Sequence, residues 1–187
     1  MGDDMILKEI EERRALRALS EKKIPEELLL RVLEAATLAP SCANSQPWRF
    51  LVLNNPETLK IVKEHLAGGN YWGKKSPAVI AVITREDLDA QLPGNRNYAF
   101  FDTGMACMNL QLQAHKEGLI SHPIAGFRAI ELREALAISD DYTLLTLIIL
   151  AYPGGEEELS EKHLIQEKSP RLRKPFSEVV FFNNWEN

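Results

Sequence analysis

The stretch APSCANSQPW, residues 39–48, joins a helix to a strand and is the first indication of the fold. Before it, apolar residues recur with helical period over residues 28–36, after Pro25, which suits the first turn of a helix. After it, Trp48–Leu53 alternates as a strand does. Pro40 ends the helix, so the short polar side chains between the two prolines predict a loop. Amide and hydroxyl groups in such a loop can hydrogen-bond a planar heterocycle, although a plain connection has the same composition.

The same periodicities assign further elements on both sides of this loop. We expect helices at Met5–Leu19, Pro56–Leu66, Ala99–Glu117 and Glu131–Ala137, strands at Ala78–Thr84 and Thr143–Ala151, a short strand and turn at Leu119–Phe127, and a loop at Ala90–Asn97. The helix over 99–117 is apolar around much of its surface, which is typical of a helix in a core or an interface. Gly118 is expected to end it in the left-handed conformation. Long helices between few strands predict an α+β fold or an α/β layered sandwich.

The last part of the chain has a different character. Pro153–Pro175 is charged and has little periodicity, whereas Val179–Phe182 is apolar and strand-like. A polar segment with an apolar end indicates an arm that crosses another surface and docks there. In one small domain, we expect that surface to belong to a second copy of the chain. The sequence therefore predicts a single domain over residues 1–187, with an extended C-terminal arm over 153–187.

Composition and charge narrow the classes of function. The chain has 187 residues, of which 45% are hydrophobic and 26% charged, as is ordinary for a soluble globular protein. A net charge of -5 argues against nucleic acid as the main partner, because phosphate backbones select basic surfaces. The two cysteines, Cys42 and Cys107, do not suggest a disulfide scaffold. There is neither an apolar run long enough to span a bilayer nor a signal-peptide core, so we expect a cytoplasmic protein without a membrane partner.

Three further clusters carry residues suited to a ligand. Arg13, Arg14 and Arg17 either clamp a phosphate or form a solvated helix face. The small residues over 122–127 either let backbone N–H groups approach a ligand closely or make a simple turn. The segment 170–175 is a second basic group, for which the plainer interpretation is a surface tail.

Other kinds of chemistry leave no sign in the sequence. Neither GxGxxG nor GxxxxGK[ST] occurs, so no Rossmann or P-loop nucleotide site is expected. The four histidines, His65, His115, His122 and His163, are scattered without metal-ligand spacing, which predicts no metal site. No histidine is near Cys42 in sequence, and we assign no catalytic nucleophile, acid or base.

Five motifs, in order along the chain, resemble those of the nitroreductase family. They are R-R-x-x-R at 13–17, A-P-S-C-A-N-S-Q-P-W-R-F at 39–50, D-x-G-x-x-x-x-N-L at 102–110, P-I-A-G-F at 123–127 and R-K-P-F-S-E-V-V at 173–180. The resemblance runs from about Ile10 to the end of the chain. It implies an α+β fold arranged as an α/β/α layered sandwich, with a central, mostly antiparallel sheet flanked by helices. It also implies a homodimer, in which the C-terminal arm reaches the partner subunit.

The resemblance further implies one FMN in each of two sites at the dimer interface. The family's cofactor-binding positions carry over as Arg13, Arg14, Ala15, Arg17, Pro40, Ser41, Cys42, Asn44, Asn70, Ile124, Ala125, Gly126, Arg173 and Lys174. The segment 13–17 would hold the phosphate, the ribityl chain and the pyrimidine edge, and 173–174 would complete the phosphate site. The loop 40–44 would come from the partner subunit and pack near the isoalloxazine. Asn70 would meet the pyrimidine edge, and the backbone N–H groups of 125–126 would face flavin N5 and O4.

Two positions depart from the family pattern. Ala15 stands where the family usually has Ser, so one hydroxyl contact to FMN is missing. Cys42 stands where a second Ser is frequent, and a thiol is a weaker hydrogen-bond partner than a hydroxyl. We expect these changes to affect the tuning of the redox potential rather than FMN binding itself.

The function that the resemblance implies is an NAD(P)H-dependent FMN oxidoreductase. NADH or NADPH would be the co-substrate, and a small-molecule acceptor such as a nitroaromatic, quinone or enone would take the electrons in a ping-pong cycle. Two alternatives stay open at this point. One is a flavoprotein of the same fold with other chemistry, namely dehalogenation, dehydrogenation or flavin fragmentation, and the other is a non-catalytic flavin-binding protein.

Overall fold

The computed structural model describes residues 6–185. Its helices are α1(Lys8–Glu12), α2(Glu26–Thr37), α3(Pro56–His65), α4(Tyr98–Lys116), α5(Ala129–Ala135) and α6(Glu161–Lys168). Its strands are β1(Arg49–Leu53), β2(Ala78–Thr84), β3(Gln91–Leu92), β4(Arg96–Asn97), β5(Ile120–Ile124) and β6(Thr143–Ala151). Four 3₁₀ segments lie between them at η1(Cys42–Asn44), η2(Gly68–Lys75), η3(Glu86–Leu88) and η4(Phe176–Glu178).

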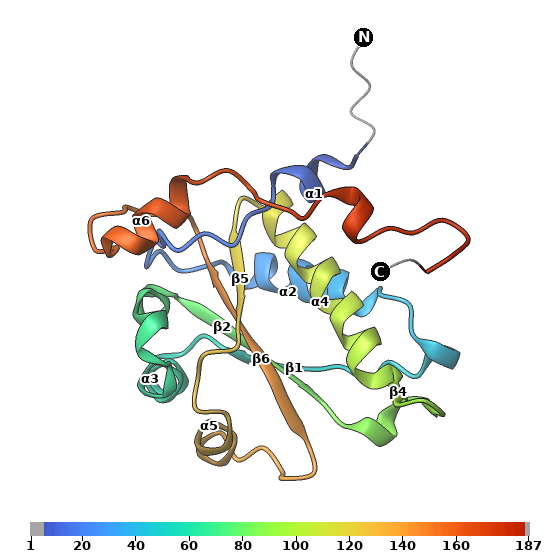
Figure 1. Ribbon diagram of the computed structural model, residues 1–187. Coiled ribbons are helices and arrows are strands. Elements are labelled where there is room, and N and C mark those ends of the chain that lie inside the picture. Colours follow the sequence, from blue (N-terminus) through green and yellow to red (C-terminus); the bar gives the residue numbers. More distant parts are fainter. Residues whose placement is uncertain (1–5, 186–187) are drawn as a thin grey trace.

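The core is a four-stranded sheet in the order β1-β2-β6-β5, and every neighbouring pair of strands is antiparallel. Ile80 pairs with Ile148 in the centre, and the strands β2 and β6 are buried on both faces. Odd-numbered residues such as Val79 and Ile149 pack with α3 and α5, and even-numbered residues such as Ile80 and Ile148 pack with α2 and α4. The sheet therefore lies between two helical layers, as Figure 1 shows. This confirms the predicted α+β layered sandwich.

Local signals end the helices where the sequence indicates. The side chain of Asn55 accepts a hydrogen bond from the Thr58 N–H at 2.9 Å, and Pro56 fills the first turn of α3. Asn97 caps α4 by accepting from the Ala99 N–H at 3.1 Å. At the other end of α4, Gly118 has a φ of +75°, the left-handed conformation predicted for it. The predicted strands at 78–84 and 143–151 have the observed bounds.

The predicted helix at Met5–Leu19 is wrong over most of its length. Met5 lies outside the described residues, α1 covers only Lys8–Glu12, and the chain then continues in extended form. Tertiary contacts prevent a helix here, because the backbone of 17–20 forms hydrogen bonds with residues far along the chain. Leu19 forms an antiparallel bridge with Pro153, and the Ser20 N–H donates to the Tyr152 carbonyl at 2.9 Å.

The C-terminal arm also differs from its prediction. Within the segment expected to lack periodicity, Glu161–Lys168 forms α6, whose N-terminus is capped by Ser160. The expected strand at Val179–Phe182 is absent from the described structure, where the arm ends in η4 and irregular chain. The predicted loop at 90–97 contains a short hairpin, in which Gln91 pairs with Asn97. The last two residues of the arm lie outside the described residues.

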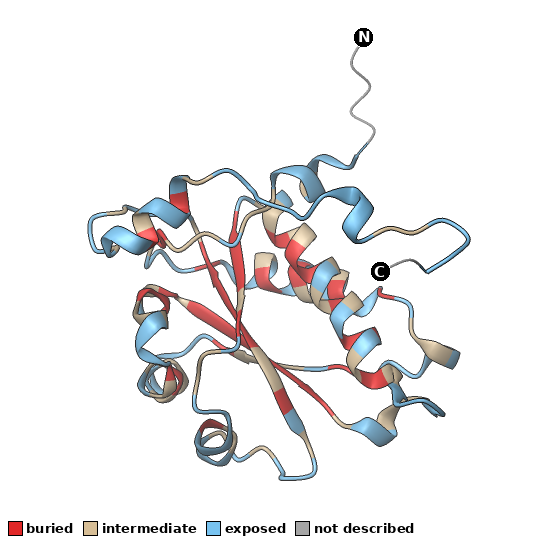
Figure 2. Cartoon of the chain, viewed as in Figure 1, coloured by how far each residue is buried: buried red, intermediate tan, exposed pale blue. Residues whose placement is uncertain are grey.

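Buried and exposed residues lie in different parts of the molecule. Figure 2 shows many of the buried residues in the sheet and in the parts of α2 and α4 that pack on it, whereas α1 and the part of the arm after α6 are mostly exposed. Large apolar side chains are exposed in both, including Ile10 of α1 and Leu172 and Phe176 of the arm. On α4, Phe101 remains 62% exposed and Met108 43% exposed. Over residues 6–185, none of the helices has the length and apolar character needed to cross a membrane.

Candidate functional site

Two basic clusters from opposite ends of the chain meet in the structure. The guanidinium of Arg171 donates to the Ile10 carbonyl at 3.0 Å and also to the Arg13 carbonyl. Partial burial lowers the pKa of Arg13, and the nearby charges of Arg171 and Arg173 lower it further. Because like charges repel, this concentration of cations is suited to a bound anion. Figure 1 shows the C-terminal arm running beside α1.

Two of the predicted arginines already donate to backbone carbonyls. The Arg14 guanidinium donates to the Ser169 carbonyl at 2.5 Å, and that of Arg173 donates to the Leu172 carbonyl at 2.7 Å. Lys174 and Ala15 are exposed. Among the described residues, the guanidinium groups of Arg13 and Arg17 form no ion pair with a carboxylate. Arg14 forms no ion pair either, but it donates to backbone carbonyls, so Arg13 and Arg17 are the two arginines of 13–17 whose guanidinium groups have no hydrogen bond within residues 6–185.

A carboxylate on α6 fixes the backbone of this basic segment. Glu167 is 9% exposed and accepts hydrogen bonds from the Arg17 N–H at 2.9 and 3.0 Å and from the Ala18 N–H at 2.9 Å. Charge-assisted hydrogen bonds of this kind are stronger than neutral ones. Sequence reasoning missed this residue, because it lies 150 positions from Arg17 in a segment without a clear pattern.

The turn after β5 brings the predicted Asn70 and Gly126 together. The Asn70 side-chain amide donates to the Gly126 carbonyl at 2.8 Å, and a Cβ at Gly126 would lie 2.6 Å from that amide nitrogen. Ile124 accepts from the Thr146 hydroxyl at 2.9 Å. The backbone N–H groups of Ala125 and Gly126 meet no acceptor within residues 6–185. Two successive donors next to an amide side chain suit the edge of a heterocycle.

His122 and Trp72 lie behind this turn, and neither is among the predicted site residues. His122 Nδ1 lies 3.0 Å from the Leu16 carbonyl, so Nδ1 carries the proton and Nε2 is an acceptor. Burial, together with the charges of Arg17 and Arg13, lowers the pKa of His122 to about 4, although the bond to Leu16 opposes this. The ring is therefore neutral at physiological pH. Its centroid is 4.5 Å from that of Trp72, over which the Arg17 guanidinium stands at 5.8 Å.

The loop predicted from the first motif is strained and exposed. Ala43, Asn44 and Gln46 have φ values of 49°, 58° and 51°, which non-glycine residues rarely adopt. Ser41 and Cys42 are half-buried, whereas Pro40 and Asn44 are exposed. Cys42 is connected to α4, because its N–H donates to the Asp102 carboxylate at 2.6 Å.

The predicted site residues form two groups that a single chain does not unite. The residues of 13–17, Asn70, 124–126 and 171–173 are linked by the contacts above. Within residues 6–185, no hydrogen bond joins the 40–44 loop to any of them. Figure 1 shows the loop on the opposite side of α4 from β5 in that view.

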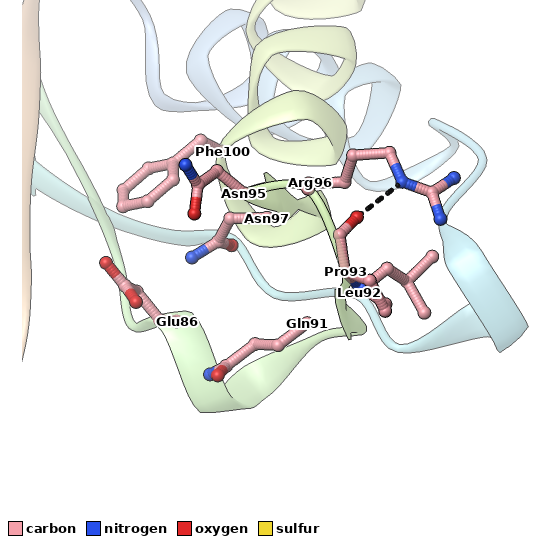
Figure 3. Close-up of a pocket in the computed structure, with 9 residues that line it drawn as sticks. Glu86, Gln91, Leu92, Pro93, Asn95, Arg96, Asn97 and Phe100 are labelled. Carbon is pink, nitrogen blue, oxygen red and sulfur yellow. Dashed lines mark hydrogen bonds between the residues drawn. The ribbon is translucent and has the colours of Figure 1, made fainter.

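Two pockets flank these groups. One, of about 230 Å³, is lined by Arg17, Tyr71, Trp72 and Lys74 and adjoins the basic segment. The other, of about 510 Å³, lies between η3, the β3–β4 hairpin and the first turn of α4, where Figure 3 shows Glu86, Asn97 and Phe100 around it. No predicted site residue lines the second pocket. In the described part of the chain, no three His, Cys, Asp or Glu side chains are grouped so as to hold a metal ion.

The first group has the chemistry that FMN requires. A phosphate needs cations, and Arg13 lies near Arg171 and Arg173 without a carboxylate partner in residues 6–185. A pyrimidine edge needs amide donors and acceptors, which Asn70 and the turn at 125–126 provide. Because Gly126 has no Cβ, the Asn70 side chain has room to lie close to the turn.

Comparison with known proteins identifies the family. The model of the nitroreductase family matches residues 10–70 and 61–152. A protein of Archaeoglobus fulgidus, provisionally named NADH dehydrogenase/NAD(P)H nitroreductase, is 31% identical over 159 residues, which cover 83% of this chain and 89% of that protein. An NADH dehydrogenase of Thermus thermophilus is 29% identical over 202 residues, with 91% of this chain and 92% of that protein covered.

Solved structures agree with this assignment. The crystal structure of an oxidoreductase containing FMN superposes with a TM-score of 0.86 at 27% identity, covering 100% of this chain and 96% of that one. A nitroreductase from Exiguobacterium sibiricum, solved in complex with FMN, has a TM-score of 0.77 at 25% identity, and 94% of this chain and 95% of that one are covered. With the family model, the relatives and the fold in agreement, this chain belongs to the nitroreductase family.

Proposed function

We propose that this protein is an FMN-dependent oxidoreductase that uses NADH or NADPH to reduce a small organic acceptor. The observation that carries the proposal is the meeting of Arg13 with Arg171 and Arg173, together with the backbone N–H groups of Ala125 and Gly126, which have no acceptor within residues 6–185. The FMN in structures of the same fold and the names of the relatives support it. Acceptors of the nitroaromatic, quinone or enone class fit an open site of this kind.

Most of the predicted residues of this group then have a role toward the cofactor or in shaping its site. Arg13, with Arg173 and Lys174, would bind the phosphate, and Arg14 holds α6 against the segment through Ser169. Arg17 is oriented by Trp72 and would favour negative charge at the pyrimidine edge. Asn70 fixes the turn at Gly126, whose N–H would face flavin N5. When bound, FMN supplies hydride acceptance and donation.

A homodimer completes this proposal. The loop carrying Pro40, Ser41, Cys42 and Asn44 does not reach the basic group of its own chain, so we assign it to the flavin of the partner subunit. The exposed Phe101 and Met108 of α4 support an interface along that helix. We further propose that residues 1–187 form one domain, that both substrates use one pocket in turn, as a ping-pong cycle requires, and that the protein acts in the cytoplasm.

A spectrum of the purified protein tests the function. We expect a yellow protein with flavin absorbance that NADH or NADPH bleaches under anaerobic conditions and that a quinone or nitroaromatic restores. The variant Arg13→Ala, assayed beside Lys60→Ala on the exposed side of α3, should lose FMN affinity by about tenfold. Protein that takes up no FMN would overturn the proposal. Bound flavin that neither nicotinamide reduces would instead indicate one of the other chemistries of this fold.

A further inference from the structure

The loop over Cys42–Gln46 holds a conformation that its own sequence does not favour. Three non-glycine residues, Ala43, Asn44 and Gln46, have positive φ values within four positions. Asn tolerates this region better than Ala or Gln, and such backbone persists only where the surrounding structure over-determines it. Ala43, Asn44 and Gln46 are also exposed, so packing does not hold them. Specific hydrogen bonds must therefore keep the loop in this shape.

Most of the hydrogen bonds of the loop are local. The Gln46 N–H donates to the Ser41 hydroxyl at 3.0 Å, and the Ser45 hydroxyl donates to the Cys42 carbonyl at 2.6 Å. Such bonds shape the loop but do not place it relative to the rest of the fold. The bond that does so is the one from the Cys42 N–H to the Asp102 carboxylate on α4, across 60 positions of sequence.

Asp102 is an unusual anchor, because it is buried beside a second carboxyl group. Its side chain is 1% exposed and faces that of Asp89. Asp89 Oδ1 accepts from the Ala90 N–H at 2.7 Å, and the buried Oδ2 has no hydrogen-bond partner in residues 6–185. Burial raises the pKa of Asp102 and the neighbouring Asp89 raises it further, while the bond from Cys42 opposes them. Asp89 itself is half-buried, and a buried carboxyl group next to a second one is stable when one proton lies between them.

No cation of the surrounding elements neutralises this pair in the described structure. The Arg49 guanidinium donates to the Gln46 and Trp48 carbonyls, and that of Arg96 donates to the Pro93 carbonyl. Arg85, before η3, pairs with Asp87 and Asp141. Glu86 and Asp87 of η3 are exposed to solvent, and between Tyr98 and Ala114 the only charged residue of α4 is Asp102 itself. A shared proton is thus the remaining way to balance the two carboxyl groups.

We propose that Asp102 is a positioning residue, which shares a proton with Asp89 and through the Cys42 N–H holds the strained 42–46 loop in the shape presented to the flavin. The part concerning the flavin rests on the proposed function, and the anchoring of the loop does not. The shared proton links α4, the loop and the segment before the β3–β4 hairpin. This gives a role to the Asp of the 102–110 motif, which none of the flavin contacts uses.

Amide hydrogen exchange at Cys42 tests the anchor directly. Asp102→Ala removes the acceptor, so protection of the Cys42 N–H should fall by about tenfold, the effect of one lost charge-assisted bond. Asp102→Asn keeps an acceptor for Cys42 and donates to Asp89, so it should restore protection to the wild-type level. The amide of Ile80, in the centre of the sheet, is the control for global unfolding. Unchanged protection in Asp102→Ala, or equal loss in Asp102→Asn, would overturn the proposal.

The dependence of stability on pH tests the shared proton without the alanine variant. A carboxyl whose pKa is raised on folding stabilises the fold below its unfolded pKa, and this stabilisation is lost as the pH rises through the folded pKa. Because the Asn of Asp102→Asn cannot ionise, the melting temperature of this variant minus that of the wild type should increase as the pH rises from about 4. When Asp102 is present, Asp89→Asn should reduce this difference by the part that Asp89 contributes, while the part due to burial of Asp102 remains. If the difference in melting temperature between Asp102→Asn and the wild type does not change with pH, Asp102 and Asp89 do not share a proton.

A third measurement separates this inference from the proposed function. In the FMN-loaded protein, the flavin absorbance spectrum should shift in Asp102→Ala and match the wild type in Asp102→Asn. If the protein binds no FMN, the proposed function fails, and the exchange and melting results still decide the role of Asp102. If exchange at Cys42 changes and the spectrum of bound flavin does not, the loop is anchored by Asp102 but does not face the flavin, and that part of the proposal is wrong.

Discussion

His122 shows how one buried side chain depends on its surroundings. It is 8% exposed, lies against Trp72 and is hydrogen-bonded to the Leu16 carbonyl, and the arginines nearby add to the cost of charging it. A neutral ring is therefore part of the folded state, and its Nδ1–H holds the backbone just before Arg17. Such a residue supports the backbone of the proposed binding segment 13–17.

We expect protonation of His122 to destabilise the protein in acid. Its pKa is 6.5 in the unfolded reference and about 4 in the fold, so the unfolded chain binds more protons in this window. The free energy of unfolding should fall by up to about 3 kcal/mol as the pH drops through it. His122→Gln should flatten this decline, whereas His65→Gln should not. Denaturant unfolding at a series of pH values measures it, and equal slopes in all three proteins would contradict the assignment.

Gly126 is needed because Asn70 approaches it. In Gly126→Ala, the new Cβ would meet the Asn70 amide nitrogen at 2.6 Å and displace it from the Gly126 carbonyl. We expect a loss of about 1 kcal/mol in stability for the broken hydrogen bond, with weaker FMN binding. Gly69→Ala is the matched control, since its Cβ would meet no atom within 4 Å. Urea unfolding and FMN titration report both effects, and identical behaviour of the two variants would show that the close approach is unimportant.

At the scale of elements, α6 holds the extended segment 13–18 in place. Figure 1 shows α6 beside the N-terminal segment, and Glu167 of α6 accepts from two successive backbone N–H groups of it. Arg14 adds a bond in the other direction, to the Ser169 carbonyl. The basic segment is therefore shaped by the second half of the chain rather than by helical propensity.

Removing the charge of Glu167 should loosen this segment. Glu167→Gln leaves one acceptor oxygen for two N–H donors, so we expect a cost of about 1–3 kcal/mol in stability and about tenfold weaker FMN binding. Glu161→Gln, on the exposed first turn of α6, is the control. Urea unfolding and FMN titration are again the measurements. Full FMN affinity in a destabilised Glu167→Gln would mean that the segment does not contribute to the cofactor site.

At the scale of the whole molecule, the end of the arm exposes apolar side chains instead of packing them on the core. It leaves α6 at Ser169, passes α1 through the bonds of Arg171, and exposes Phe176, Val179 and Phe182. Exposed apolar side chains at the end of a basic segment are costly in a monomer and fit a second copy of the chain.

Deleting Arg171–Asn187 should therefore weaken both FMN binding and dimerisation. Point variants separate the two effects. Arg171→Ala with Arg173→Ala should lower FMN affinity while the dimer remains, and Phe176→Ser with Phe182→Ser should weaken the dimer first. Light scattering and flavin absorbance on size-exclusion fractions measure both. A truncated protein that stays a fully loaded dimer would show that the arm has neither role.

The sequence alone determined what depends on local pattern. Apolar runs placed the strands at 78–84 and 143–151, and Gly118 marked the end of a helix, because these signals act between near neighbours. The motifs also identified the family, since they need only residue identity and order. None of this required knowledge of distant contacts.

Only the tertiary structure decided which distant groups meet. It converted the expected helix after Glu12 into extended chain, because Glu167 and Pro153 offer that backbone better partners than a helix would. It placed Asp102 beside Asp89 and within hydrogen-bond distance of the Cys42 N–H. It also placed His122 within hydrogen-bond distance of the Leu16 carbonyl, although each pair is separated along the chain. The physical reason is that hydrogen bonds and desolvation act through space, so a local pattern carries no record of the partner that a buried polar group will find.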